Sequence, residues 1–332
     1  MERDQLREAL ERRSAAKAET RPILTQLNGD NSWLVFYHVV LDPWLAGPTT
    51  LLGAWVIHID RPEPAAISTA EKIEELIRDI ERSAAGSLAS DSTPLLDAIM
   101  IGHTNSDHLH ENTLRMFDPA TPVIASKKAS AKIQAFGHFD AIHTLHIFPA
   151  TATSWNVPEL HPGGPIPRWF TPLYVEGLAE LNYSLAITWT HAAQPGPESP
   201  VVHETILQSP HGIQLSAGSL NAFLSAEPAR KPLAMLHALK ESYTLGFQST
   251  RGVLGGLELW RKTGGVGYWL PTHESKLIYS GVMMRLLMVN DVYRSLDWAL
   301  EEEAKVAADG EIPSKERPNL VEVANGQSII LE

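Results

Sequence analysis

The sequence predicts an α/β protein, because segments typical of buried strands alternate with segments typical of helices. Residues 96–102, LDAIMIG, form a short apolar run closed by glycine, as in a buried strand. Residues 67–84 begin with a Ser-Thr cap and carry apolar residues at helical spacing, as in an amphipathic helix. Two further strand segments, at 122–126 and 141–148, enclose a helical segment at 129–137. This repeated alternation favours a sheet covered by helices.

The remaining elements of the first half follow from the same patterns. Residues 4–18 are polar with helical spacing, which indicates a solvated helix, and residues 111–117 begin another helix after a polar loop. Strands are expected at 23–28 and 32–44, separated by the turn residues NGDN. Residues 51–59 fit either a buried strand or a loop.

A Pro/Gly-rich connection at residues 160–174 divides the chain into two comparable halves. In the second half a strand is expected at 183–191, a loop at 192–200, and a hairpin at 204–219 that turns at Pro210-His211-Gly212. Further on, the patterns predict helices at 232–241, 253–262 and 281–305, a strand at 266–273, and a terminal strand or hairpin at 320–332.

Composition narrows the classes of partner. The chain has 332 residues and a net charge of −12, so it shows no basic footprint for nucleic acid or for an anionic membrane surface. It has no cysteine, so a metal would have to be held by His, Asp, Glu, Asn or water. Neither a signal peptide nor an apolar run of about 18 residues is visible. We therefore expect a cytoplasmic protein with a small-molecule substrate; the oligomeric state is open.

Residues 102–114, GHTNSDHLHENTL, concentrate side chains that ligate metals. His103, Asp107 and His108 follow a predicted buried strand directly and precede a helix. A loop at the carboxyl end of a strand holds such side chains beside a crevice. The residues alone are equally consistent with polar loop residues that only cap the next helix.

GHTNSDHLH resembles the His-x-His-x-Asp-His motif of the metallo-β-lactamase superfamily, with Asn105 in place of the second histidine. HVVLDPWLAG is similar to an early strand of that family that ends in an aspartate, here Asp42. THAAQPG offers His191 as the family's isolated histidine, and LPTHESK offers His273 as its last one. ILQSPHGIQLSAGS resembles the family's hairpin, which normally ends Gly-Asp, but Ser219 stands at the aspartate position.

The resemblance extends from about residue 25 to about residue 285 and is strongest to the lactonase-like branch of the family. It implies a four-layer αββα sandwich with the active site at one edge of the two sheets. We accordingly expect a helical extension at residues 1–21 and a single domain at residues 22–332. That domain would be built from two halves, about 22–160 and 170–332.

The resemblance also implies two metal positions. The first would use His103, Asn105 and His191, and the second Asp107, His108 and His273. Asn105 offers a neutral carbonyl oxygen, a weaker zinc donor than imidazole, and Ser219 supplies no bridging charge. The expectation is one firmly held ion per chain, zinc before manganese or iron, or a site that has lost its metal.

Four other side chains are expected to have lesser roles. Asp42 is expected to hold a ligand histidine rather than the metal. His110 is assigned to the next helix, His211 to turn chemistry, and His203 to a position outside the site.

Three hypotheses for function follow. The first is a metal-dependent hydrolase of a small ester, lactone or thioester, in which a metal-bound water attacks and Asp107 orients or deprotonates it. The second is a non-hydrolytic biosynthetic enzyme that performs a cyclisation, elimination or decarboxylation on the same scaffold. The third is a metal-free binding protein.

Overall fold

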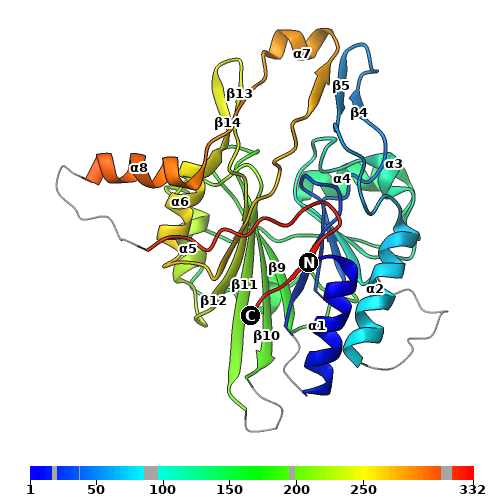
Figure 1. Ribbon diagram of the computed structural model, residues 1–332, viewed down its shortest axis with the longest axis vertical. Coiled ribbons are helices and arrows are strands. Elements are labelled where there is room, and N and C mark those ends of the chain that lie inside the picture. The colour runs from blue at the N-terminus through cyan, green and yellow to red at the C-terminus, as the bar shows by residue number, and fades with distance from the viewer. Residues whose placement is uncertain (17–20, 37, 86–95, 194–198, 308–315) are drawn as a thin grey trace.

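A computed structural model of the protein describes all residues except 17–20, 37, 86–95, 194–198 and 308–315 (Figure 1). Two large sheets form its centre. The first has the strand order β18-β1-β2-β3-β6-β7-β8. Its strands are β1 (Ile23–Gln26), β2 (Trp33–Val35), β3 (Val39–Leu41), β6 (Ala98–Ile101), β7 (Val123–Ala125), β8 (Ile142–Thr144) and β18 (Ser328–Ile330). From β3 to β8 the neighbouring strands are parallel, so their carboxyl ends meet at one edge.

The second sheet has the strand order β15-β12-β11-β10-β9. Its strands are β9 (Phe170–Val175), β10 (Ser184–Ala192), β11 (Val201–Ser209), β12 (Lys231–His237) and β15 (Tyr268–Leu270). The strands β11, β12 and β15 are parallel to one another. They too bring their carboxyl ends to a common edge.

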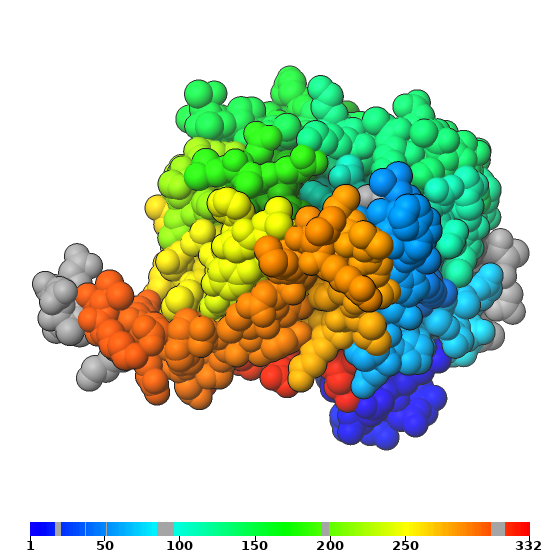
Figure 2. Space-filling model, turned by 90° about the horizontal axis from the view of Figure 1, so that it is seen from above, coloured from blue at the N-terminus to red at the C-terminus, as the bar shows by residue number. Residues whose placement is uncertain are grey.

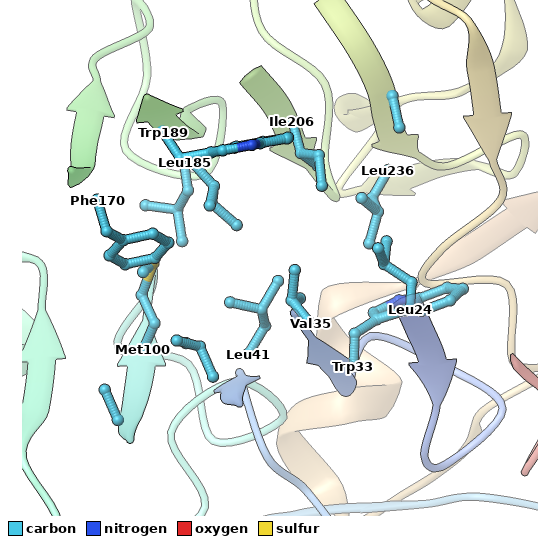
Figure 3. Close-up of a cluster of buried hydrophobic side chains, with 14 of the residues drawn as sticks. Leu24, Trp33, Val35, Leu41, Met100, Phe170, Leu185, Trp189, Ile206 and Leu236 are labelled. Carbon is cyan, nitrogen blue, oxygen red and sulfur yellow. The ribbon is translucent and has the colours of Figure 1, made fainter. Parts of the chain in front are cut away.

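The two sheets pack face to face over an apolar core (Figure 3). Leu24, Trp33 and Leu41 reach into it from the first sheet. Leu185 and Ile206 meet them from the second. These side chains are almost completely buried, and removal of that apolar surface from water stabilises the sandwich.

Helices cover the outer face of each sheet. The helices α1 (Arg3–Ala15), α2 (Ala70–Ala85), α3 (Glu111–Leu114) and α4 (Lys127–Phe136) lie on the side of the first sheet, and α5 (Gly218–Ser225), α6 (Gly252–Lys262) and α8 (Leu296–Ala307) lie on that of the second. Leu6 of α1 and Ile77 of α2 belong to the same buried cluster as Ile99 of β6. Phe223 of α5 and Leu257 of α6 pack with Met235 of β12. The fold is therefore the αββα sandwich that the sequence predicts.

Two small sheets and a short helix project from one edge of the sandwich (Figure 1). One sheet contains β4 (Thr49–Leu51), β5 (Ile57–Asp60) and β16 (Ile278–Ser280), and the other contains β13 (Glu241–Thr244), β14 (Phe247–Arg251) and β17 (Asn290–Val292). The helix is α7 (Val282–Leu287), and a 3-10 turn, η1 (Pro158–Leu160), lies in the connection between the halves.

Three predicted elements differ in the structure. Residues 232–241 were expected to be helical but form β12, because the apolar run is buried between two parallel neighbours. A continuous helix over 281–305 is replaced by α7, β17 and α8. The expected hairpin at 204–219 keeps β11, but the chain then turns into α5 instead of returning as a strand.

Other expectations agree with the structure or lie outside it. The ambiguous segment 51–59 contains the turn between β4 and β5. The helix expected at residues 4–18 is α1. The last residues of the expected helix 4–18, and most of the loop at 192–200, lie outside the described residues. The division into an extension and one two-half domain stays a prediction. In the part of the chain that the structure describes, no helix has both the length and the apolar character needed to cross a membrane.

Candidate metal centre

Three buried histidines converge at the edge where the parallel strands end. His108 follows β6 of the first sheet, and His211 and His273 follow β11 and β15 of the second. One ring nitrogen of each lies within 4.8 Å of the others, and all three side chains are buried. The strand ends of both sheets thus supply the cluster, as expected for an active site at a sheet edge.

The distances within the cluster fit a single small cation. Nε2 of His108 lies 3.2 Å from Nε2 of His211. Oδ2 of Asp107 lies 3.5 Å from Nε2 of His108 and 3.6 Å from Nε2 of His273. Zinc bound tetrahedrally at about 2.0–2.1 Å places its donors roughly 3.3–3.4 Å apart. Three of the separations among these donor atoms are therefore close to those that such an ion requires.

Each ring is fixed through its other nitrogen. Nδ1 of His108 donates to Oδ2 of Asp42 at 2.9 Å. Nδ1 of His211 hydrogen-bonds with the hydroxyl of Thr250 at 2.9 Å. Nδ1 of His273 lies 3.3 Å from both carboxylate oxygens of Asp30. Such contacts orient metal-ligating histidines and leave Nε2 free for the ion.

The two supporting carboxylates are themselves held in place. Asp42 accepts from the backbone N–H of Gly102 at 2.8 Å and from Nε2 of Gln208 at 3.1 Å. Asp30 accepts from the backbone N–H of Ser275 at 3.1 Å. Burial alone would raise the pKa of Asp30, but His273 and other positive partners lower that pKa to about 2. A charged carboxylate is thus buried against the ring of His273, which favours positive charge beside it.

The histidines differ in their electrostatics. Burial opposes the charge on His108, but Asp107 and Asp42 outweigh it and raise the pKa of His108 to about 9. Burial, followed by the neighbouring His273 and His108, holds the pKa of His211 well below its usual range. His211 is therefore neutral, which is the form that binds a metal.

His103 borders the cluster. Its ring centroid lies 5.8 Å from that of His108 and 6.4 Å from that of His211. Its Nδ1 accepts from the backbone N–H of Asn105 at 3.0 Å, whereas its buried Nε2 has no hydrogen-bond partner among the described residues. Burial, then the charge of His108, lowers the pKa of His103 to about 4.

A cavity of about 320 Å³ opens beside His103. Gly102 and His103 form its inner wall, and Lys128, Glu176 and Glu180 are among its polar lining residues. The cavity is large enough for a small molecule, and His103, which borders the cluster, is one of its lining residues.

The structure does not bring together the expected first metal position. Leu185 of β10 pairs with Gln208 at the end of the strand that faces the cluster. His191 lies six residues further along β10, which places it about 20 Å from that end. There its Nε2 hydrogen-bonds with Glu204 at 3.1 Å. Asn105 is exposed, and its backbone carbonyl accepts from the backbone N–H of His108.

The remaining candidates also lie elsewhere. Ser219 is in α5, where its hydroxyl donates to the carbonyl of Phe148 at 2.7 Å, because the expected hairpin is a helix. His110 caps α3 through Thr113, as expected. His203 hydrogen-bonds with Thr190 and remains outside the cluster, again as expected.

Sequence reasoning missed two residues of the cluster. His211 was assigned to the turn, and Asp30 was taken as part of the turn NGDN. The signal that could have found His211 is its place directly after a strand, the placement that singled out His103 and His108; His273 was expected from the family resemblance. Asp30 carried no such signal, because its partner His273 is distant in sequence.

Comparisons with known proteins place the fold. No protein-family model matches the chain, and no curated protein matches it. The chain resembles the crystal structure of an isothiocyanate hydrolase from Delia radicum gut bacteria, with a TM-score of 0.54 and 15% identity over 93% of this chain and 99% of that one. It also resembles a structure described as a possible metal-dependent hydrolase from Veillonella parvula, with a TM-score of 0.50 and 12% identity over 95% of this chain and 100% of that one. At these identities the likeness shows a shared fold.

Proposed function

We propose that the protein is a metal-dependent hydrolase of a small molecule with an electrophilic carbon. The main observation behind the proposal is that His108, His211 and His273 converge. Each ring is held by a contact of its Nδ1. The shared fold supports the proposal, since one protein with that fold is described as an isothiocyanate hydrolase and another as a possible metal-dependent hydrolase.

In this proposal Nε2 of the three histidines holds one ion, and Asp107 lies beside it. Three imidazoles and a carboxylate suit zinc, with manganese and iron as alternatives. A bound ion of this kind acidifies water and polarises a carbonyl-like group. Asp42 and Asp30 hold the rings, and Thr250 fixes His211.

Two residues are assigned to the reacting atoms. The carboxylate of Asp107 would orient the attacking water and accept its proton, since its Oδ2 lies 3.5 Å from Nε2 of His108 and 3.6 Å from Nε2 of His273. His103 presents a buried, unpartnered Nε2 beside the cavity. Being neutral, it hydrogen-bonds to the substrate or to its leaving group as the substrate arrives along the cavity wall.

The substrate classes follow from this chemistry. Esters, lactones and thioesters have a carbonyl carbon that water can attack, and the resemblance to the lactonase-like branch favours lactones among them. An isothiocyanate also has an electrophilic central carbon, and one protein of the same fold is described as its hydrolase. These four classes form the test panel.

A second candidate is a non-hydrolytic enzyme that performs a cyclisation, elimination or decarboxylation. It is favoured by one departure from the hydrolase pattern: Ser219, at the position of the expected bridging carboxylate, lies in α5 with its hydroxyl on the carbonyl of Phe148. Without that bridging carboxylate, the three histidines would hold an ion that supplies Lewis-acid chemistry to a bound substrate.

The experiment combines metal content with activity. The full chain is reconstituted with zinc, analysed for metal, and assayed on a phenyl ester, a lactone, a thioester and an isothiocyanate, with and without chelator. We expect about one ion per chain and hydrolysis of at least one class, lost with chelator and restored by zinc. Essentially no metal after reconstitution would exclude both candidates, and metal without hydrolysis would favour the second.

A further inference from the structure

Seven strongly exposed apolar side chains gather on the projecting edge of the molecule. We call this surface the crest and define it by seven side chains from three segments. They are Leu52 and Trp55 from the β4–β5 turn, Leu245 and Phe247 from the β13–β14 turn, and Val282, Leu286 and Met288 from α7 and the residue after it. Each of the seven is between 52% and 79% exposed.

The three segments form one continuous surface. The backbone N–H of Val282 donates to the carbonyl of Trp55 at 2.9 Å, which ties α7 to the β4–β5 turn. The backbone N–H of Leu245 donates to the carbonyl of Leu287 at 2.9 Å, which ties the β13–β14 turn to α7. Figure 2 shows the three segments side by side as a band of yellow, orange and blue.

The crest is almost free of charge. Across residues 49–57, 243–249 and 281–290, Arg285 is the one charged side chain, in a chain whose net charge is −12. Two copies of such a chain repel each other over most of their surfaces. The crest is the face on which they approach with the least repulsion, whereas an anionic membrane is disfavoured by the net charge.

The area of the crest also fits a second copy. Seven large side chains, each about two-thirds exposed, present on the order of 900 Å² of surface if each offers roughly 200 Å² in full. The largest apolar patch of a typical monomer is about 300–600 Å². A standard stable interface buries about 800 Å² per partner. The apolar area of the crest is larger than the largest patch of a typical monomer. It is close to the area that each partner buries in a standard interface.

We propose that the crest is the interface on which a second copy of this chain docks to form a symmetric dimer. A twofold interface buries the same patch on both copies, and the crest offers one continuous patch on each chain. The strand β14 also carries Thr250, which holds His211. The interface therefore adjoins the edge of the sandwich that carries the candidate metal centre.

The test measures the mass of the full chain by light scattering coupled to gel filtration over a range of concentrations. The expected result is twice the chain mass for the wild type and the single-chain mass for the double variant Phe247→Asp with Leu286→Asp. The matched control is Val306→Asp with Val201→Asp, because these side chains have the same exposed fractions, 79% and 62%, but lie away from the crest. The control should remain a dimer.

A monomeric wild type at about 100 μM, or a crest variant that remains a dimer, would overturn the proposal. Binding of a monomeric wild type to neutral phosphatidylcholine vesicles would overturn it in favour of a membrane. If the double variant fails to fold, single cysteines replace it, since the chain has none. Maleimide labelling of Phe247→Cys should then slow as protein concentration rises, while labelling of Val306→Cys stays constant. Equal behaviour of the two would also refute the interface.

Discussion

Oδ2 of Asp42 lies 2.9 Å from Nδ1 of His108, and both side chains are completely buried. Two strands meet in this contact, because Asp42 follows β3 and His108 follows its parallel neighbour β6. The carboxylate fixes the ring so that Nε2 faces His211 and Asp107. A buried ion pair of this kind costs desolvation, which is consistent with a role in positioning a ligand.

The variant Asp42→Asn should weaken metal binding. An amide of the same shape keeps contacts to Gly102 but no longer stabilises the ring of His108, and loss of such a partner typically lowers metal affinity by about 10- to 100-fold. Competition with a chromogenic chelator measures the change. Asp97→Asn is the matched control, because Asp97 contacts His38 outside the cluster. Equal metal affinities of the two variants would show that Asp42 does not position the metal ligand His108.

Alanine variants should identify the ligand set. His108→Ala, His211→Ala and His273→Ala each remove one of three convergent nitrogens, and each should lose tightly bound metal. His191→Ala should retain it, because His191 contacts Glu204 at the far end of β10. Elemental analysis after zinc reconstitution and desalting provides the measurement. Metal loss in His191→Ala together with retention in His211→Ala would reverse the assignment.

The double variant Asn105→His with Ser219→Asp should not create a second metal position. The side chain of Asn105 is exposed, and Ser219 lies in α5 with its hydroxyl on the carbonyl of Phe148. Neither new side chain would point into the cluster. Calorimetric zinc titration should give one tight site for both the wild type and the variant, and a second tight site in the variant would contradict the placement of these residues.

Elements that depend on interactions between residues close in sequence could be predicted, and those that depend on residues distant in sequence could not. The strand at 96–102 and the helix at 67–84 carry complete local patterns and were predicted correctly. Residues 232–241 were not, because a fully buried strand has no alternation and is decided by its neighbours in the sheet. In the candidate site, His108 was proposed from its place after a strand and His273 from the family resemblance, and their role as ligands stays a prediction. His211 was missed because its turn-forming neighbours offered a sufficient local explanation, and Asp30 because only the fold brings it to His273.

Glu204 should act as a structural residue that neutralises buried positive charge. Its carboxylate accepts from Arg21 at 3.0 and 3.2 Å and hydrogen-bonds with His191. Glu204→Gln leaves the largely buried Arg21 without its counter-charge, which typically costs about 3–5 kcal/mol. Urea denaturation should show a loss of this order, with metal content unchanged in the folded protein. Replacing both partners, as Arg21→Met with Glu204→Leu, should restore much of the stability; failure to do so would mean that the pair stabilises by more than mutual neutralisation.

Gly256 in α6 should be intolerant of alanine because Trp269 occupies the space of a side chain. A Cβ at this position would lie 2.2 Å from Cζ2 of Trp269. Helix propensity alone predicts that Gly256→Ala stabilises the protein by about 1 kcal/mol, whereas overpacking of a buried contact costs typically about 1–3 kcal/mol. Because the indole is fully buried and its Nε1 is held by the carbonyl of His237, it cannot move aside, and we expect net destabilisation. The smaller ring in Trp269→Phe should relieve the clash, so the double variant should be more stable than the sum of the single changes implies. Urea denaturation of the four proteins measures this coupling, and strictly additive effects would show that the two residues do not share this space.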